Sequence, residues 1–343
     1  NSDNPVGDFF TESRAARAGG VTSVIDMPNT NPQTTSLELM EIKEKMAASQ
    51  SSVNYGFMIG ATNDNIEQLL AIPPQRYAAI KLFLGSSTGN MLVSDPEKLN
   101  LLFQKTRKLI VAHCEEEAVV MSNMHNYMLE FQGTVNETAA LHPKIRNTEA
   151  CFLSTYKAIE RARAYKTPLH IAHISSSTEL DLLSNQAIGV KHVTAEVTPN
   201  HLWFDDRDYE KYGNLIKCNP SIKNNNDRLA LWAALYDDRI DTIATDHAPH
   251  PFENKQKPYF DAPSGIPSIQ HSLQMMLESF FNESVRDDER KELIQSWFPL
   301  IVTKMCHNPA TLFNISQRGF IRDGYFADLV LLHPVQHGIE VTQ

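Results

Sequence analysis

The sequence predicts an α/β fold of the (β/α)8, or TIM-barrel, type. Short apolar runs alternate with helical stretches along most of the 343 residues. The runs are apolar enough to be buried on both faces, as the strands of a parallel sheet are. Polar and charged residues directly follow several runs, which is where barrel enzymes place their active sites. Seven strands are identified, one fewer than such a barrel requires.

The composition favours a globular protein that acts on a small molecule. Hydrophobic residues make up 42% of the chain, enough for one large α/β domain and a smaller one. A formal net charge of -10 argues against a nucleic-acid or anionic-membrane surface. No apolar run is long enough to span a membrane, and no signal peptide is recognised. Four widely separated cysteines suit reduced thiols, so we expect a cytoplasmic protein: Cys114, Cys151, Cys218 and Cys306.

Helical spacing and turn residues place the elements in order. Residues 9–18 form a predicted helix that Gly19 and Gly20 end. A strand over residues 21–27 enters a turn-rich loop, and an amphipathic helix follows over 37–49. Further strands are predicted over residues 53–60, 78–84, 109–113, 168–174, 191–197 and 241–245. Helices are predicted between them over residues 66–70, 96–105, 149–165, 178–184 and 227–235.

The last third of the chain changes character after the final strand. A loop rich in proline and glycine covers residues 262–265, and helices are predicted over 269–281, 288–297 and 301–313. Residues 319–332 have turn-plus-strand character. We therefore expect a metal-dependent barrel over residues 1–318 and the start of a small β domain over 319–343.

A carboxylate and two histidines follow the last predicted strand, in the stretch Ile-Ala-Thr-Asp-His-Ala-Pro-His that contains Asp246. Burying such groups costs several kcal/mol unless they are coordinated or hydrogen-bonded. A metal site at the carboxyl end of a barrel strand would account for them, and so would a capping Asp followed by two solvated histidines. The pattern recurs, because Asn29, Lys81, His113 and His173 each lie within or directly after another predicted strand.

These residue types predict a divalent metal centre, with Zn²⁺ favoured by nitrogen and oxygen ligands. Lys81 is flanked by apolar strand residues and has no easy route to water. If its amine reacts with CO₂, the resulting carbamate can bridge two metal ions. Such a pair would activate water and polarise a carbonyl, as hydrolysis requires, with Asp246 as proton shuttle. Asn29, Asn219 and His250 offer donors suited to a carboxylate substrate, although each alone also fits an ordinary turn.

Five motifs resemble, in order, the signatures of the dihydroorotases in the amidohydrolase superfamily. They are Met27-Pro28-Asn29-Thr30, Ile80-Lys81-Leu82, Val111-Ala112-His113-Cys114-Glu115, His170-Ile171-Ala172-His173-Ile174-Ser175 and Thr245-Asp246-His247-Ala248-Pro249-His250. The resemblance covers essentially the whole chain. It implies a binuclear zinc site in a TIM-type barrel and the reversible cyclisation of N-carbamoyl-L-aspartate to L-dihydroorotate in pyrimidine biosynthesis.

The resemblance also implies roles for single residues. Lys81 matches the carboxylated lysine that bridges two zinc ions, and His113 and His173 match ligands of one zinc. Asp246 matches the ligand of the other zinc and the catalytic acid and base. The positions that match substrate contacts are Asn29, Asn219, His250, Pro263, Ser264 and Gly265. We also expect a homodimer.

The start of the chain departs from this family pattern. Members begin the barrel with a His-x-His strand followed by a substrate-binding arginine, and this sequence has no histidine before His113. Arg14 lies in a predicted helix and does not fit the motif. We interpret the chain as a barrel without its first strand and without most of the β domain. Two alternatives are another cyclic amidohydrolase, such as an allantoinase or hydantoinase, and an inactive dihydroorotase-like partner of aspartate transcarbamoylase.

Overall fold

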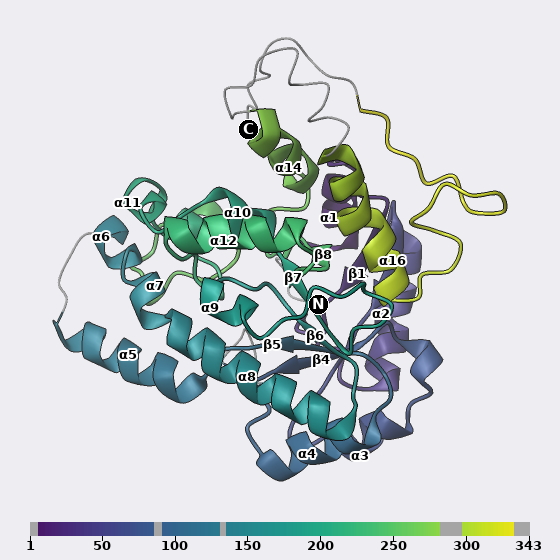
Figure 1. The fold of residues 1–343 in the computed structure, drawn as a ribbon, viewed down its shortest axis with the longest axis horizontal. Coiled ribbons are helices and arrows are strands. Elements are labelled where there is room, and N and C mark those ends of the chain that lie inside the picture. The colour runs from purple at the N-terminus through teal and green to yellow at the C-terminus, as the bar shows by residue number, and fades with distance from the viewer. Residues whose placement is uncertain (1–5, 86–90, 131–134, 282–296, 333–343) are drawn as a thin grey trace.

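Parallel strands form the centre of the protein, and helices surround them (Figure 1). The computed structural model describes residues 6–85, 91–130, 135–281 and 297–332. The strands are β1 Ser23–Asp26, β2 Asn54–Phe57, β3 Ile59–Gly60, β4 Ile80–Phe83, β5 Ile110–His113, β6 Leu169–Ile171, β7 Val193–Val197 and β8 Thr242–Ile243. All seven predicted strand regions are therefore confirmed.

The strands pair in the order of the sequence, as a barrel requires. Strand β1 pairs with β2, and the six strands from β3 to β8 each pair in parallel with the next. Met58 separates β2 from β3, so one predicted strand changes partner from β1 to β4 along its length. Within the described residues no strand joins β8 to β1, and the ring of strands stays open there.

Helices follow most strands, and several begin with a side-chain cap. Asp8, Ser36, Asp95, Asn147 and Asn224 each accept a hydrogen bond from a backbone N–H in the first turn of the helix that follows. The predicted helices that the structure confirms are α1 Phe9–Ala18, α2 Leu37–Gln50, α3 Ile66–Ala71, α4 Pro96–Lys105, α8 Thr148–Tyr165, α9 Ser177–Leu180, α12 Asn225–Tyr236 and α14 Ser272–Phe281.

Other helices were not predicted, and one C-terminal helix differs from its prediction. The additional helices are α5 Glu117–Glu130, α6 Val135–Ala139, α7 His142–Ile145, α10 Pro199–Trp203, α11 Asp208–Tyr212, α13 Phe252–Lys255 and the 3-10 turns Pro74–Arg76 and Gly213–Ile216. The helix predicted over 301–313 contains a π-helical turn, Thr303–His307, before α16 Asn308–Leu312. The helix predicted over 288–297 lies outside the described residues except for Trp297.

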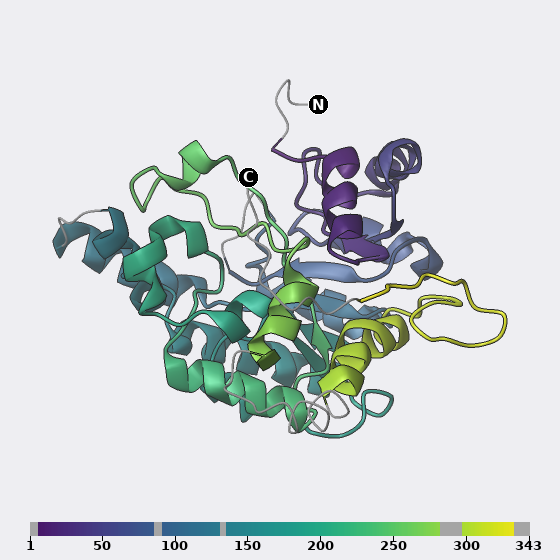
Figure 2. The ribbon, with the colours of Figure 1, turned by 90° about the horizontal axis from the view of Figure 1, so that it is seen from above.

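The strand predicted within residues 319–332 does not form. That segment contains turns and extended backbone but has no ladder partner in the described part of the chain, and Ile321 and Leu331 are almost fully exposed. Figure 2 shows it as a yellow loop that leaves the body of the protein. A strand needs a neighbour for its backbone hydrogen bonds, so apolar alternation alone did not produce one.

Side chains alternate between two environments along the central strands. Ile80 and Leu82 of β4 belong to the main core, where they lie with the apolar faces of α4 and α8. Lys81 lies between them in the strand, so its side chain points to the opposite face of the sheet, which it shares with its register partner Val111. The same alternation turns the His113 side chain toward this inner face, beside Phe83. The fold therefore brings polar groups of different strands together inside the ring.

Helix α1 links the two ends of the open ring. It lies beside α2 at one side of the molecule (Figure 2, purple). Its Glu12 carboxylate lies 2.5 Å from Nε2 of His247, which directly follows Asp246. The other ring nitrogen of His247 accepts a hydrogen bond from the backbone N–H of Ile269 at 3.2 Å. The segment that carries Asp246 is thus fixed from two sides. None of the described helices has the length and hydropathy to cross a lipid bilayer.

Candidate active site

The four residues predicted as metal ligands come from four strands and are arranged around one end of the ring. Lys81 lies in β4, His113 ends β5, His173 follows β6 and Asp246 follows β8. The carboxyl ends of parallel strands meet at one edge, so these positions face a common region. His173 and Asp246 adopt left-handed backbone angles, with φ of 38° and 44°. Non-glycine residues seldom adopt this conformation, and it is concentrated at functional sites.

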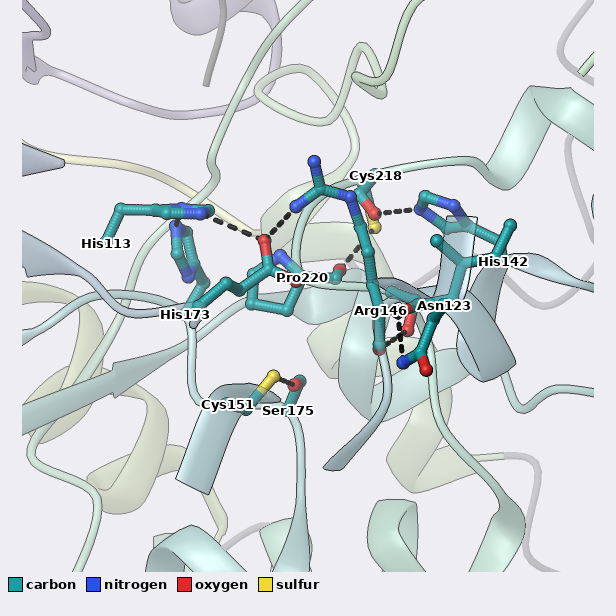
Figure 3. A network of polar contacts seen from close by, with 12 residues as sticks. His113, Asn123, His142, Arg146, Cys151, His173, Ser175, Cys218 and Pro220 are labelled. Carbon is teal, nitrogen blue, oxygen red and sulfur yellow. Dashed lines mark hydrogen bonds and ion pairs between the residues drawn. The ribbon is translucent and has the colours of Figure 1, made fainter. Parts of the chain in front are cut away.

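The two histidines are in direct contact. Nδ1 of His113 lies 3.1 Å from Nε2 of His173, and both rings are buried (Figure 3). Burial lowers the pKa of His113, and it lowers that of His173 well below the usual value. Both imidazoles are therefore neutral near pH 7, the form that binds metal ions. Nδ1 of His173 is buried and has no hydrogen-bond partner.

Two carboxylates lie close enough to Lys81 to influence its charge. Burial lowers the pKa of the Lys81 ammonium, and the charges of Glu196 and Asp246 oppose that effect. Burial raises the pKa of Asp246 to about 7, while Lys81 acts in the opposite direction. The sequence interpretation overlooked Glu196, although a charged residue inside the apolar strand β7 gives the same signal that identified Lys81. Nε2 of His170 lies 3.0 Å from a Glu196 carboxylate oxygen.

A second carboxylate that the sequence interpretation missed supports His113 directly. Glu115 is fully buried, and one of its oxygens lies 3.0 Å from Nε2 of His113. The same oxygen accepts a hydrogen bond from the guanidinium of Arg146, the residue that directly follows α7 (Figure 3). Arg146 and His113 outweigh the effect of burial and hold the pKa of Glu115 at about 2. A carboxylate bonded to the far nitrogen of a histidine ligand fixes the orientation of the ring.

The low pKa of Glu115 predicts a contribution to stability that disappears in acid. The carboxyl has a pKa near 4.5 when unfolded and about 2 when folded, so its contribution is complete above pH 4.5 and is lost as the pH falls toward 2. The lost stability is on the order of 3 kcal/mol. We expect Glu115→Gln to make the free energy of unfolding less dependent on pH over this range. Urea titrations of metal-free wild type and variant at several pH values measure it, and equal slopes would contradict the assignment.

The donor set suits a divalent cation, although the side chains do not form a closed cage. Across the described ranges, no three His, Cys, Asp or Glu side chains are grouped closely enough to hold a metal ion. Two neutral imidazoles in contact and an unbonded buried His173 nitrogen are nevertheless what a zinc ligand pair requires. A cation between these rings would replace their hydrogen bond, because both lone pairs would then be used. The residues fit a metal ion on this ground.

Most of the residues predicted to contact substrate lie on three segments that hydrogen bonds connect. His250 Nε2 donates to the Ser264 carbonyl at 3.1 Å, and the Gly265 N–H donates to the Lys217 carbonyl at 2.8 Å. A Cβ at Gly265 would lie 2.5 Å from the Ala248 carbonyl, so only glycine permits this close approach.

Asn219 and Pro263 lie on the same segments, and Asn29 lies on a different segment. The Asn219 side-chain oxygen is buried without a hydrogen-bond partner. Pro263 is bound through its carbonyl to Lys255 at 3.0 Å. Asn29 comes from the other sheet, in the loop after β1, and is half-buried. The structure thus connects the Asn219, His250 and 263–265 segments through the backbone.

The fold and these motifs define an amidohydrolase. The amidohydrolase family model matches residues 8–341, and the chain belongs to this family. It is 30% identical over 331 residues to a dihydroorotase from Methanosphaera stadtmanae, covering 96% of this chain and 72% of that protein. An allantoinase from Salmonella gallinarum is 26% identical, covering 95% of this chain and 71% of the relative.

The fold prediction is confirmed by solved structures. The L-hydantoinase of Arthrobacter aurescens superimposes with a TM-score of 0.82 at 24% sequence identity, covering 94% of this chain and 70% of that one. The chain is therefore a cyclic amidohydrolase with a TIM-barrel-type fold. The small β domain, the zinc ligands and the substrate contacts stay predictions.

Proposed function

We propose that this protein is a dihydroorotase, which interconverts N-carbamoyl-L-aspartate and L-dihydroorotate. The observation that carries the proposal is the placement of Lys81, His113, His173 and Asp246 at the ends of four strands around one inner face. The similarity to dihydroorotases from several archaea supports this substrate. The grouping of Asn219 and His250 next to the 263–265 segment supports this substrate as well, because it would place an amide and an imidazole beside the carboxylate that distinguishes dihydroorotate from neutral cyclic amides.

The predicted metal ligands would hold zinc in this site. His113, His173, Asp246 and a carboxylated Lys81 would hold the metal. Bound zinc would lower the pKa of a water molecule and polarise the amide carbonyl of the ring. Glu115 would keep the His113 ring in its ligand orientation through the contact at 3.0 Å. The low pKa of Lys81 relative to a free lysine favours the neutral amine, the form that reacts with CO₂.

Asp246 is the residue that moves the proton. In hydrolysis it would accept a proton from the attacking water and donate it to the amide nitrogen that leaves, and the reverse order closes the ring. In the metal-free protein, burial raises the pKa of its carboxyl to about 7, while the Lys81 ammonium acts in the opposite direction. Asn219, His250 and the backbone of residues 263–265 would hold the substrate's carboxylate and ring amide in place.

A second candidate is hydrolysis of a neutral cyclic amide. It is favoured by the similarity to an allantoinase and to the fold of an L-hydantoinase. These relatives share the barrel, so only the substrate pocket separates the candidates. The third candidate, an inactive partner of aspartate transcarbamoylase, would bind little zinc and turn over none of these substrates.

Parallel assays with three substrates test the proposal. We expect kcat/KM for L-dihydroorotate to exceed those for allantoin and hydantoin by at least about 100-fold, because a site built for a carboxylate leaves buried donors unpaired with a neutral ring. Zinc is measured on the same sample by elemental analysis, and about two ions per chain are expected from the bridged centre. Faster hydrolysis of hydantoin would transfer the assignment to the second candidate. Absence of all turnover with substoichiometric zinc would support the third.

A further inference from the structure

Two buried lysines join the segments that carry the predicted substrate residues. Lys255, the last residue of α13, directs its ammonium to the carbonyls of Lys217, Pro263 and Gly265 at 3.1, 3.0 and 2.8 Å. An ammonium has three N–H donors, so the three carbonyls satisfy all of them. Neither Lys255 nor Lys217 forms an ion pair within the described residues, and both are buried. Two carbonyl-bound cations without a carboxylate partner are uncommon in a protein interior.

Lys217 repeats the arrangement from the opposite side. Its ammonium donates to the carbonyls of Tyr259 and Ala262, both at 2.6 Å. Its own carbonyl accepts from both the Lys255 ammonium and the Gly265 N–H. Burial lowers the pKa of both lysines to about 8, which leaves them largely protonated at pH 7. The two ammonium groups therefore hold residues 259–265 from both ends.

His142 adds a third connection between the same segments. One of its ring nitrogens lies 2.6 Å from the Tyr259 hydroxyl. The other lies 2.7 Å from the Cys218 carbonyl (Figure 3). Burial lowers its pKa well below the usual value, so the ring is neutral and donates only one of these hydrogen bonds. Residues 217–219 and 259–265 are thus tied together by three side chains that are not themselves predicted to touch the substrate.

We propose that Lys255 and Lys217 act as an ammonium clamp that sets the geometry of the substrate pocket. They are positioning residues, because they bind backbone carbonyls on either side of Ser264 and, through the Lys217 carbonyl, the segment that leads to Asn219. The kinetic part of this inference rests on the proposed function, whereas the clamp itself is a property of the free protein. The ligand that the clamped segments would receive is a cyclic amide, whose edge pairs with backbone N–H and C=O groups.

The first test measures the clamp without substrate. Lys255→Met keeps an apolar stem of similar length but removes the ammonium donor from the Pro263 and Gly265 carbonyls and leaves the Lys217 carbonyl with the Gly265 N–H alone. We expect amide hydrogen exchange of peptides within residues 256–266 to become at least about tenfold faster in this variant, because a lost connection permits local opening. Lys304→Met is the matched control. Lys304 is also buried, and its ammonium donates to the Ile240 carbonyl. Ile240 precedes β8, so this contact lies at the opposite end of that strand from Asp246.

The second test measures the pocket through kinetics with L-dihydroorotate on zinc-loaded protein. We expect Lys255→Met to raise KM by at least about tenfold and to change kcat by less than about threefold, since it disturbs binding more than proton transfer. Lys304→Met should lower the melting temperature and leave KM unchanged. The clamp is overturned if exchange of residues 256–266 is equal in wild type and Lys255→Met, or if both lysine variants shift exchange and KM alike. If wild type hydrolyses no dihydroorotate, the proposed function fails, and the exchange result still decides the clamp.

Discussion

Replacing Asp246 with alanine should lower kcat/KM for the cyclic amide by at least about 1000-fold. General acid-base catalysis and metal binding each contribute a factor of this order, and Asp246 is predicted to serve both. The fold should survive, because burial disfavours the charge on this carboxylate and raises its pKa to about 7. Steady-state kinetics and the thermal melting temperature measure the two effects on one sample.

Asp237→Ala is the matched control for this change. Asp237 lies just after α12, is exposed, and pairs with Arg239 ahead of β8, at the opposite end of that strand from Asp246. We expect its kcat/KM to stay within about twofold of wild type, as is usual for surface substitutions. Activity of Asp246→Ala within tenfold of wild type would remove Asp246 from the mechanism and with it the dihydroorotase proposal.

Arg146→Met should lower the free energy of unfolding by about 3–5 kcal/mol, because removing one partner of a buried ion pair leaves the other charge uncompensated. Glu115 is fully buried, and its oxygen Oε1 has no hydrogen-bond partner. Among its neighbours, the arginine does most to lower the pKa of the Glu115 carboxyl and so to keep it charged. Urea unfolding of metal-free protein at pH 7 measures the loss.

Two further variants separate this effect from general damage. Arg163→Met removes an exposed ion pair with Glu160 on α8 and should cost less than about 1 kcal/mol. Glu115→Gln combined with Arg146→Met should recover part of the lost stability, since no charge remains buried without a partner. If the double variant loses as much free energy of unfolding as the two single variants together, Arg146 and Glu115 are not coupled.

The strands and long helices could be predicted because their signals are local. The apolar runs that contain Lys81, end at His113 or precede Asp246 predict strands close to the positions that the structure gives them. The short helices could not be predicted, since α6, α7, α10, α11 and α13 have four or five residues, too few for a periodic pattern. Helix α5 is longer, but its apolar residues are distributed around the helix, and Met121 and Leu129 are exposed.

The strand-borne part of the candidate site gave the clearest signal in the sequence. A charged residue at the end of an apolar strand is visible in the sequence, which is why Lys81 and Asp246 were found. Glu196 gave the same signal and was overlooked. Arg146 and Lys255 follow no strand, and their roles arise from contacts with distant segments. Nothing in their local sequence distinguishes them from exposed cations, which are far more common.

At His173 and Asp246, the left-handed backbone angles make the residue that is best for stability different from the residue that catalysis requires. A non-glycine residue held in this region costs of order 1 kcal/mol or more. Glycine adopts the same angles without that cost, so selection for thermal resistance alone would favour glycine at both positions. Such selection would remove two of the four predicted zinc ligands. A laboratory lineage evolved only for heat tolerance would therefore tend to preserve the barrel while losing its chemistry.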